Sequence, residues 1–274
     1  MAGATQQDIA AEQRRIRNLI PSKDTARDWT FHDAIKAGTV KHKPLPPKVD
    51  LRERWWKVGN QGSTGSCIGW AAADGVMRYL LVKAGRIEPT TLLSPRFIWM
   101  AAKEFDSDRR RPETFIEAAG TSLKTAADIC RKFGVALHSE LPFTIRTAMV
   151  LGDPEAFFES VATRRAASYF NARQDLEQWR KALAAGHPIL TGLNADSSWD
   201  EAPADGKLDG WKGRGGGHAV CVVGYRRDGR FIIRNSWGRG WGHHGFAYAS
   251  EEYIRAAFFE EAYVLSVARQ APPA

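Results

Sequence analysis

The hydrophobic pattern gives the two halves of the chain different predicted structures. From Cys67 to about Val82, small and apolar residues follow a helical pattern, which predicts a buried helix. A second helix is predicted after Ser94, which is followed by proline, and a third runs from Thr121 to a terminating Gly134. The first half of the main body is therefore predicted to be rich in helices.

After about residue 145 the pattern becomes typical of β-structure. One further helix is predicted from Gln174, and five short β-prone runs follow it, separated by turns that contain glycine. These runs are "HPILTGLN", "GHAVCVVGY", "RFIIRNS", "HGFAYAS" and "EAYVLSV". They predict antiparallel strands, so we expect an α+β fold with a helical lobe over about 61–145, a β-barrel-like lobe over about 146–267, and a cleft between the lobes.

Residues 1–48 are predicted to be an extension of the main domain, which spans 49–267 and ends in a tail over 268–274. Ile9, Ile16 and Leu19 favour an amphipathic helix over residues 5–20, and the three prolines within 41–50 favour an extended linker. The extension carries too many apolar side chains to be stable alone in water. We expect it to dock on the domain, either across the cleft or as a structural arm.

Composition and charge exclude several classes of protein. The chain of 274 residues has no apolar run long enough for a membrane helix and no signal-peptide pattern at its start. Its net charge is +8, but residues 1–48 hold half of that excess and the remainder is diffuse. Neither a membrane nor nucleic acid is therefore expected as a partner.

The three cysteines, Cys67, Cys130 and Cys221, are too scattered for a disulfide framework or a zinc site. We expect a reducing, cytoplasmic environment, no metal and no cofactor. Cys130 and Cys221 are interpreted as buried packing residues.

Cys67 lies where a thiol can become a nucleophile. It follows the glycine-containing run "NQGSTGS" at the predicted start of a helix, where the helix dipole favours the thiolate. A partner imidazole must come from elsewhere in the chain, and His218 stands at the start of a predicted strand after three glycines. His218 is therefore the candidate general base and acid.

Two further residues complete the candidate site. Asn235, at the end of the next predicted strand, can accept a hydrogen bond from the second nitrogen of His218, and Trp237 can shield that bond from water. Gln61 and the backbone N–H of Cys67 can donate hydrogen bonds to the negative oxygen that develops during acyl transfer. The catalytic prediction is thus Gln61, Cys67, His218 and Asn235.

These residues stand in motifs that resemble those of the papain-family cysteine peptidases. "QGSTGSC" is similar to the segment with the oxyanion glutamine and the nucleophile, "GHAV" to the histidine segment, and "NSWGRGWGHHGF" to the asparagine and tryptophan segment. The resemblance covers residues 46–267. It implies a papain-like fold, an endopeptidase that acts on peptide or protein substrates, and an N-terminal segment that blocks the enzyme as in a zymogen.

The resemblance also implies substrate-binding positions and shows some departures. Gly120 resembles the glycine whose backbone pairs with an extended substrate, Gly192 falls near the wall of a side-chain pocket, and Trp237 lies near the catalytic pair. Gly217, the fourth of these substrate-binding positions, precedes His218 where many relatives carry aspartate. Thr64 replaces a cysteine that usually forms a disulfide, which suits a bacterial-type member.

Two other uses of this fold remain open from the residues alone. An acyl transferase would pass the acyl group to a second amine, and a binding or scaffold protein would not hydrolyse anything. The complete set of four catalytic residues favours the peptidase.

Overall fold

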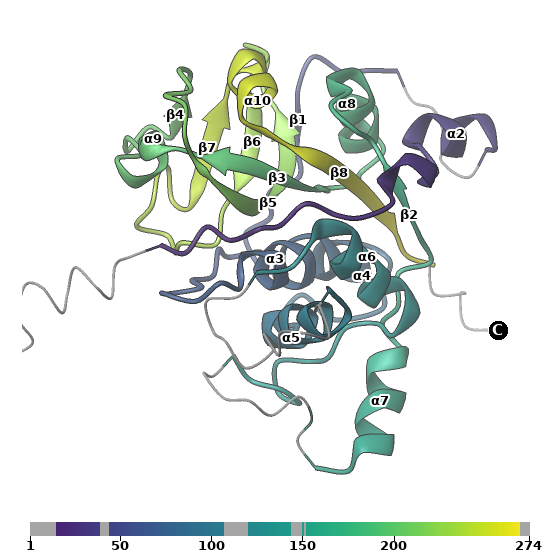
Figure 1. Cartoon of the computed structure of the whole chain (residues 1–274). Helices are drawn as coiled ribbons and strands as arrows, with labels where there is room; N and C mark the ends of the chain where they lie inside the picture. The colour runs from purple at the N-terminus through teal and green to yellow at the C-terminus, as the bar shows by residue number, and fades with distance from the viewer. Residues whose placement is uncertain (1–14, 39–43, 107–119, 144–149, 151, 269–274) are drawn as a thin grey trace, which may run out of the picture.

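The computed structural model describes residues 15–38, 44–106, 120–143, 150 and 152–268 (Figure 1). Most of the helix predicted over 5–20 and residues 269–274 of the predicted tail lie outside these ranges. No helix within the described ranges has both the length and the hydropathy of a membrane span.

Most of the helices begin at a side chain that caps their first turn. Ser122, Asp153, Asp175 and Ser250 each accept a hydrogen bond from a backbone N–H two or three residues further on. The short 3-10 helix is η1 (Thr25–Arg27), and the α-helices are α2 (Phe31–Lys36), α3 (Cys67–Gly69), α4 (Arg78–Lys83), α5 (Pro95–Asp106), α6 (Leu123–Lys132), α7 (Pro154–Ala162), α8 (Leu176–Ala184), α9 (Ser197–Asp200) and α10 (Glu251–Ala257). A π-helical stretch, Trp70–Met77, joins α3 to α4 without a break.

The strands form one sheet in the order β2-β8-β3-β5-β6-β7-β4, with β1 paired to β5. All described pairs are antiparallel except β4 with β7. The strands are β1 (Val49–Asp50), β2 (Ser168–Asn171), β3 (Ile189–Ala195), β4 (Lys207–Leu208), β5 (Gly216–Tyr225), β6 (Phe231–Arg234), β7 (Phe246–Ala249) and β8 (Phe258–Ser266).

The sheet separates two hydrophobic cores. Along β5, Ala219, Cys221 and Val223 pack in a core shared with α3–α6, whereas Val220 and Val222 pack in a second core with α8 and α10. This alternation is what a strand buried on both faces requires. Figure 1 shows helices α3 to α7 on one side of the sheet, and α8 and α10 on the other, with α2 beside α8.

The helix that begins at Cys67 packs very closely on β5. A Cβ atom added to Gly75 would lie 3.1 Å from the Cβ of Cys221, so a larger residue at position 75 would push the helix away from the strand. Ala71, Ala72 and Ala73 on the same helix are also buried. Small side chains therefore set the distance between the two layers.

A buried ion network joins this helix to β6. Asp74 accepts from Arg78, with 3.1 Å between nitrogen and oxygen, and from Arg234, at 2.5 Å. Trp56 donates its ring N–H to the Asp74 backbone oxygen at 2.7 Å, and Arg234 lies over the Trp56 ring. The network fixes the helix relative to the strand that leads directly into Asn235.

The predicted α+β class is confirmed, and several local predictions need correction. The prediction of a helix through residues 15–20 was wrong, because that stretch is extended and uses its backbone to pair with distant residues, as Leu19 does with Gly217. Strands β1, β2 and β4 and helices α2, α7, α9 and α10 were not predicted. The helix after Cys67 is π-helical over much of its length.

Loss of the buried carboxylate should strongly destabilise the protein. Asp74→Ala leaves two buried arginines without their counter-ion, so we expect the free energy of unfolding to fall by about 3–5 kcal/mol. Urea denaturation measures this loss in an inactive Cys67→Ala chain. Glu177→Ala, which removes an exposed pair with Lys181, is the control and should cost under about 1 kcal/mol. Equal losses would contradict the importance of the network.

Candidate active site

Cys67 is the first residue of α3 and is almost completely buried. The preceding residue, Ser66, makes no side-chain capping bond to the helix, so the backbone N–H groups of the first turn remain available. Those of Cys67 and Ile68, with the N–H of Ala219 on β5, lie close enough to the thiol to favour its ionised form. The thiol therefore lies where the helix start meets β5.

His218 lies on β5 beside Ala219 and is paired with Asn235. The ring Nε2 of His218 lies 2.7 Å from Oδ1 of Asn235, and both side chains are buried. Asn235 follows directly after β6, which pairs with β5. The ring Nδ1 of His218 makes no hydrogen bond within the described part of the chain, so this nitrogen is available for proton transfer.

Three tryptophans surround this pair. The His218 ring lies 4.8 Å from that of Trp237 and 5.5 Å from that of Trp199, between ring centres. Trp241 stacks on Trp199 at 5.2 Å. The sequence singled out Trp237 as a shield, but it gave no sign that Trp199 also contacts the imidazole, because Trp199 lies on α9, which has no distinctive motif.

Gln61 is held rigidly in the loop before Cys67. Its Nε2 donates to the backbone oxygen of Thr64 at 2.9 Å, and its Oε1 accepts from the hydroxyl of Ser236 at 2.7 Å. Its backbone N–H also donates to the Ser236 oxygen at 2.8 Å. Because an amide nitrogen carries two hydrogens, the second can still be donated to a substrate oxygen.

Burial keeps the thiol and the imidazole neutral. It raises the pKa of Cys67 to about 11, although the nearby backbone N–H groups lower it in part. Burial also lowers the pKa of His218 to about 4, which the Asn235 hydrogen bond partly offsets and the charges of Arg17 and Arg15 reinforce. Between these values the structure holds a thiol and an imidazole, not an ion pair.

Residues 15–20, here called the crossing stretch, lie next to this site, and Leu19 belongs to the same hydrophobic core as Cys67. Figure 1 shows the stretch in purple between the sheet and helices α3 and α6. Leu19 donates its backbone N–H to the Gly217 oxygen at 2.9 Å, and Ile20 donates to the Thr121 oxygen at 3.3 Å. The stretch thus pairs with both halves of the domain at once.

The three glycines predicted to bind substrate all contact the crossing stretch. A Cβ at Gly120 would lie 1.6 Å from the Asn18 oxygen, one at Gly192 would lie 2.5 Å from the Leu19 side chain, and one at Gly217 would lie 2.6 Å from the Leu19 oxygen. Glycine at each position is therefore required for this close approach.

Two arginines of the crossing stretch lie over Trp237. The guanidinium carbons of Arg15 and Arg17 are 5.7 and 5.5 Å from the ring centre, which is suitable for cation–π contact. Arg15 also donates to the Gly62 oxygen at 3.2 Å, and Arg17 pairs with Asp200. Neither arginine could be assigned a role from the sequence, because nothing local in "EQRRIRNL" distinguishes them from solvated charges.

No other described group competes as the reactive site. Burial raises the pKa of Cys130 and Cys221 to about 12, and neither has a histidine partner. Among the described residues, no cluster of three or more His, Cys, Asp or Glu is arranged to hold a metal ion. A hollow of about 750 Å³ lined by Arg52, Arg226 and Tyr248, among others, contains none of the four predicted catalytic residues.

Comparison with known proteins identifies the family of this chain. The family described as papain family cysteine protease matches residues 45–264, which include all four predicted catalytic residues. The chain belongs to the papain family. Its crossing stretch and the residues up to 44 precede the part that matches.

The relatives in this family are distant. A peptidase C1-like protein of Acanthamoeba polyphaga mimivirus is 25% identical over 209 residues, which cover 71% of this chain and 64% of that protein. A cysteine protease of Blomia tropicalis is 26% identical over 214 residues, which cover 74% of this chain and 61% of that protein. The chain thus spans slightly less than two thirds of these papain-family proteins.

Solved structures share the papain-like fold. The cysteine protease xylellain from Xylella fastidiosa matches with a TM-score of 0.77 and 22% identity, over 94% of this chain and 98% of that one. The ragweed cysteine protease Amb a 11 in its proform matches with a TM-score of 0.67 and 21% identity, over 96% of this chain and 77% of that one.

The depressed pKa of His218 should make stability dependent on pH. Above the unfolded pKa of about 6.5, His218 is neutral in both the folded and the unfolded chain. As the pH falls from there towards about 4, the unfolded chain binds a proton that the folded chain does not, so the free energy of unfolding decreases. In a Cys67→Ala chain, the free energy of unfolding should fall by about 2–3 kcal/mol between pH 7 and 4.5 because of this group. Denaturation at both pH values, repeated with His218→Gln added, isolates that loss. The same decrease in both variants would exclude His218 as its source.

Proposed function

We propose that the protein is a cysteine endopeptidase, held inactive by its own crossing stretch. The observation that supports this best is the 2.7 Å contact between His218 and Asn235, next to a thiol at a helix start. Asn235 fixes the imidazole so that Nδ1, which has no hydrogen-bond partner in the described structure, is free to exchange a proton with Cys67.

The reaction uses each of these groups in turn. The Cys67 proton passes to His218, and the sulfur attacks the peptide carbonyl carbon, whose oxygen accepts hydrogen bonds from Gln61 and from the Cys67 N–H. The C–N bond then breaks, and His218 gives its proton to the leaving amine. Water loses a proton to His218 and attacks the thioester, which releases a carboxylic acid and restores the thiol.

The crossing stretch is proposed to inhibit in two ways. It occupies the three glycines at which an extended peptide would have to pair. It also excludes water from Cys67 and His218 and places two cations near the imidazole, both of which oppose the thiolate–imidazolium pair. A related ragweed protease is known as a proform, which supports this role.

Removal of the crossing stretch should activate the enzyme. A chain that begins at Ser22 should cleave small fluorogenic peptides at least about tenfold faster than the full chain, because both the steric and the electrostatic barriers are gone. Turnover is measured on the two chains at equal concentrations. Cys67→Ala in the shorter chain is the control and should abolish cleavage. A folded but inactive Ser22 chain would overturn the proposed activity.

Gln61 should affect turnover more than substrate affinity. In the Ser22 chain, Gln61→Ala should lower kcat by about 10²–10³-fold with little change in KM, because the lost hydrogen bond strengthens only as the oxygen becomes negative. Steady-state kinetics provide the measurement. Gln178→Ala removes a buried amide from α8 and should leave kcat unchanged. An unchanged kcat for Gln61→Ala would remove this residue from the mechanism.

A further inference from the structure

We infer that the N-terminal segment divides at Pro21–Ser22 into a part to be removed and a part that stays in the active enzyme. The removable part ends with the crossing stretch. The permanent part is residues 22–36, here called the anchored stretch. The removal of the crossing stretch rests on the proposed peptidase function. The retention of the anchored stretch concerns stability and does not depend on that function.

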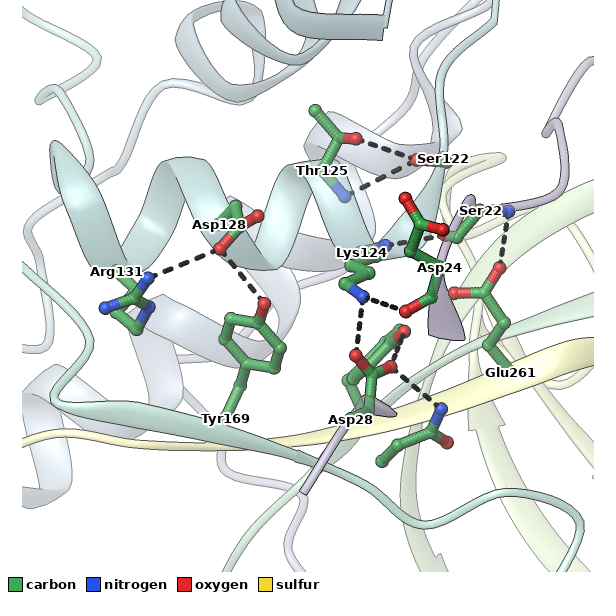
Figure 2. A network of polar contacts seen from close by, with 12 residues as sticks. Ser22, Asp24, Asp28, Ser122, Lys124, Thr125, Asp128, Arg131, Tyr169 and Glu261 are labelled. Carbon is green, nitrogen blue, oxygen red and sulfur yellow. Dashed lines mark hydrogen bonds and ion pairs between the residues drawn. The ribbon is translucent and has the colours of Figure 1, made fainter. Parts of the chain in front are cut away.

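The anchored stretch is held by a buried carboxylate. Lys124, at the start of α6, lies 2.6 Å from Oδ1 of Asp28 and also donates to the Asp24 oxygen at 2.7 Å. The other oxygen of Asp28 accepts from Tyr263 at 2.7 Å and from Asn171 at 3.2 Å (Figure 2). Asp28 therefore links a helix and two strands, and its removal would leave three polar groups of the domain without this partner.

A short helix fixes the anchored stretch in the core. Phe31 and Ala34 of α2 are fully buried, in a cluster that includes Phe170 and Trp179. A capping box between Thr30 and Asp33 starts the helix, and Asn171 donates its backbone N–H to the Trp29 oxygen at 2.8 Å. These residues precede residue 45, where the family match begins, and they add a buried element to the second core.

The first residue of the anchored stretch contacts a buried acid. Ser22 donates its backbone N–H to Oε1 of Glu261 at 2.7 Å, and its hydroxyl accepts from the Lys124 N–H at 3.0 Å (Figure 2). Glu261 is only 1% exposed, and its Oε2 has no hydrogen-bond partner in the described structure. Within the described residues Glu261 forms no ion pair, and burial raises the pKa of its carboxyl group, so a positive charge at the Ser22 nitrogen would favour the ionised carboxylate.

Hydrolysis of the Pro21–Ser22 bond would create that charge. An endopeptidase and one water would leave a carboxylate on Pro21 and an α-amino group on Ser22, which is protonated near neutral pH. The surrounding residues Ile20, Pro21, Lys23 and Asp24 are exposed, so the bond is accessible. The crossing stretch could then leave, while the new ammonium group pairs with Glu261.

Thermal unfolding of inactive Cys67→Ala chains tests the division. A chain that begins at Ser22 loses the contacts of the crossing stretch, among them the buried Leu19 side chain, but keeps its anchors and gains an ion pair, so its Tm should stay within about 5 °C of the full chain. A chain that begins at Leu45 should melt at least about 10 °C lower, because it loses several buried contacts together. An unchanged Tm for the Leu45 chain, or a large decrease for the Ser22 chain, would overturn the inference.

If the Leu45 chain does not fold, point variants of the full chain test whether the anchored stretch contributes to stability. Phe31→Ala and Asp28→Asn should each lower the Tm by more than about 4 °C, whereas Trp29→Ala, at a side chain that is 63% exposed, should change it little. If all three variants melt like the full chain, the anchored stretch is not part of the fold.

The role of Glu261 has its own control. Glu261→Gln should lower the Tm more in the Ser22 chain than in one that begins at Pro21, because the α-amino group of the latter is displaced by one residue. Equal effects in both chains would exclude the ion pair. An inactive Ser22 chain that keeps its Tm would refute only the proposed peptidase, whereas an active one with a collapsed Tm would refute only the permanent role of the anchored stretch.

Discussion

The chemistry of this protein depends on the close packing of one helix against one strand. Cys67 begins the helix, His218 lies on β5, and no local segment of the chain contains both. The helix and the strand are closest where Gly75 meets Cys221, since a Cβ added to Gly75 would lie only 3.1 Å from that of Cys221, and the buried Asp74–Arg234 pair fixes the helix to β6. Since protein interiors are close-packed, a larger residue in this contact would move the thiol away from the imidazole.

The same junction accounts for the protonation state of the site. A thiolate and an imidazolium are stable together only if their surroundings solvate the charges. The crossing stretch fills those surroundings with apolar and backbone groups, so Cys67 holds its proton and His218 does not accept one. Arg15 and Arg17 add positive charge near a ring that would have to become positive. Under the proposed function, one segment thus blocks the substrate path and also disfavours the reactive form of the enzyme.

The sequence predicted what depends on local pattern and missed what depends on distant pairing. Gln61, Cys67, His218 and Asn235 stand in distinctive motifs, and the structure brings the helix start, the imidazole and the amides to one junction. The path of residues 15–20 was mispredicted because Ile16 and Leu19 fit a helical pattern. Their actual partners lie far away in sequence, as Leu19 shows with Gly217, and an extended stretch of this kind has no periodicity of its own.

The reactivity of the Cys67 thiol shows whether the crossing stretch keeps it protonated and covered. The rate of Cys67 alkylation by iodoacetamide, located by peptide mapping, is measured between pH 4 and 11 for the full chain and for a chain that begins at Ser22. The shorter chain should react rapidly even in the acidic range, as a thiolate–imidazolium pair does, whereas the full chain should react slowly until the pH approaches about 11. Superimposable profiles for the two chains would contradict the account.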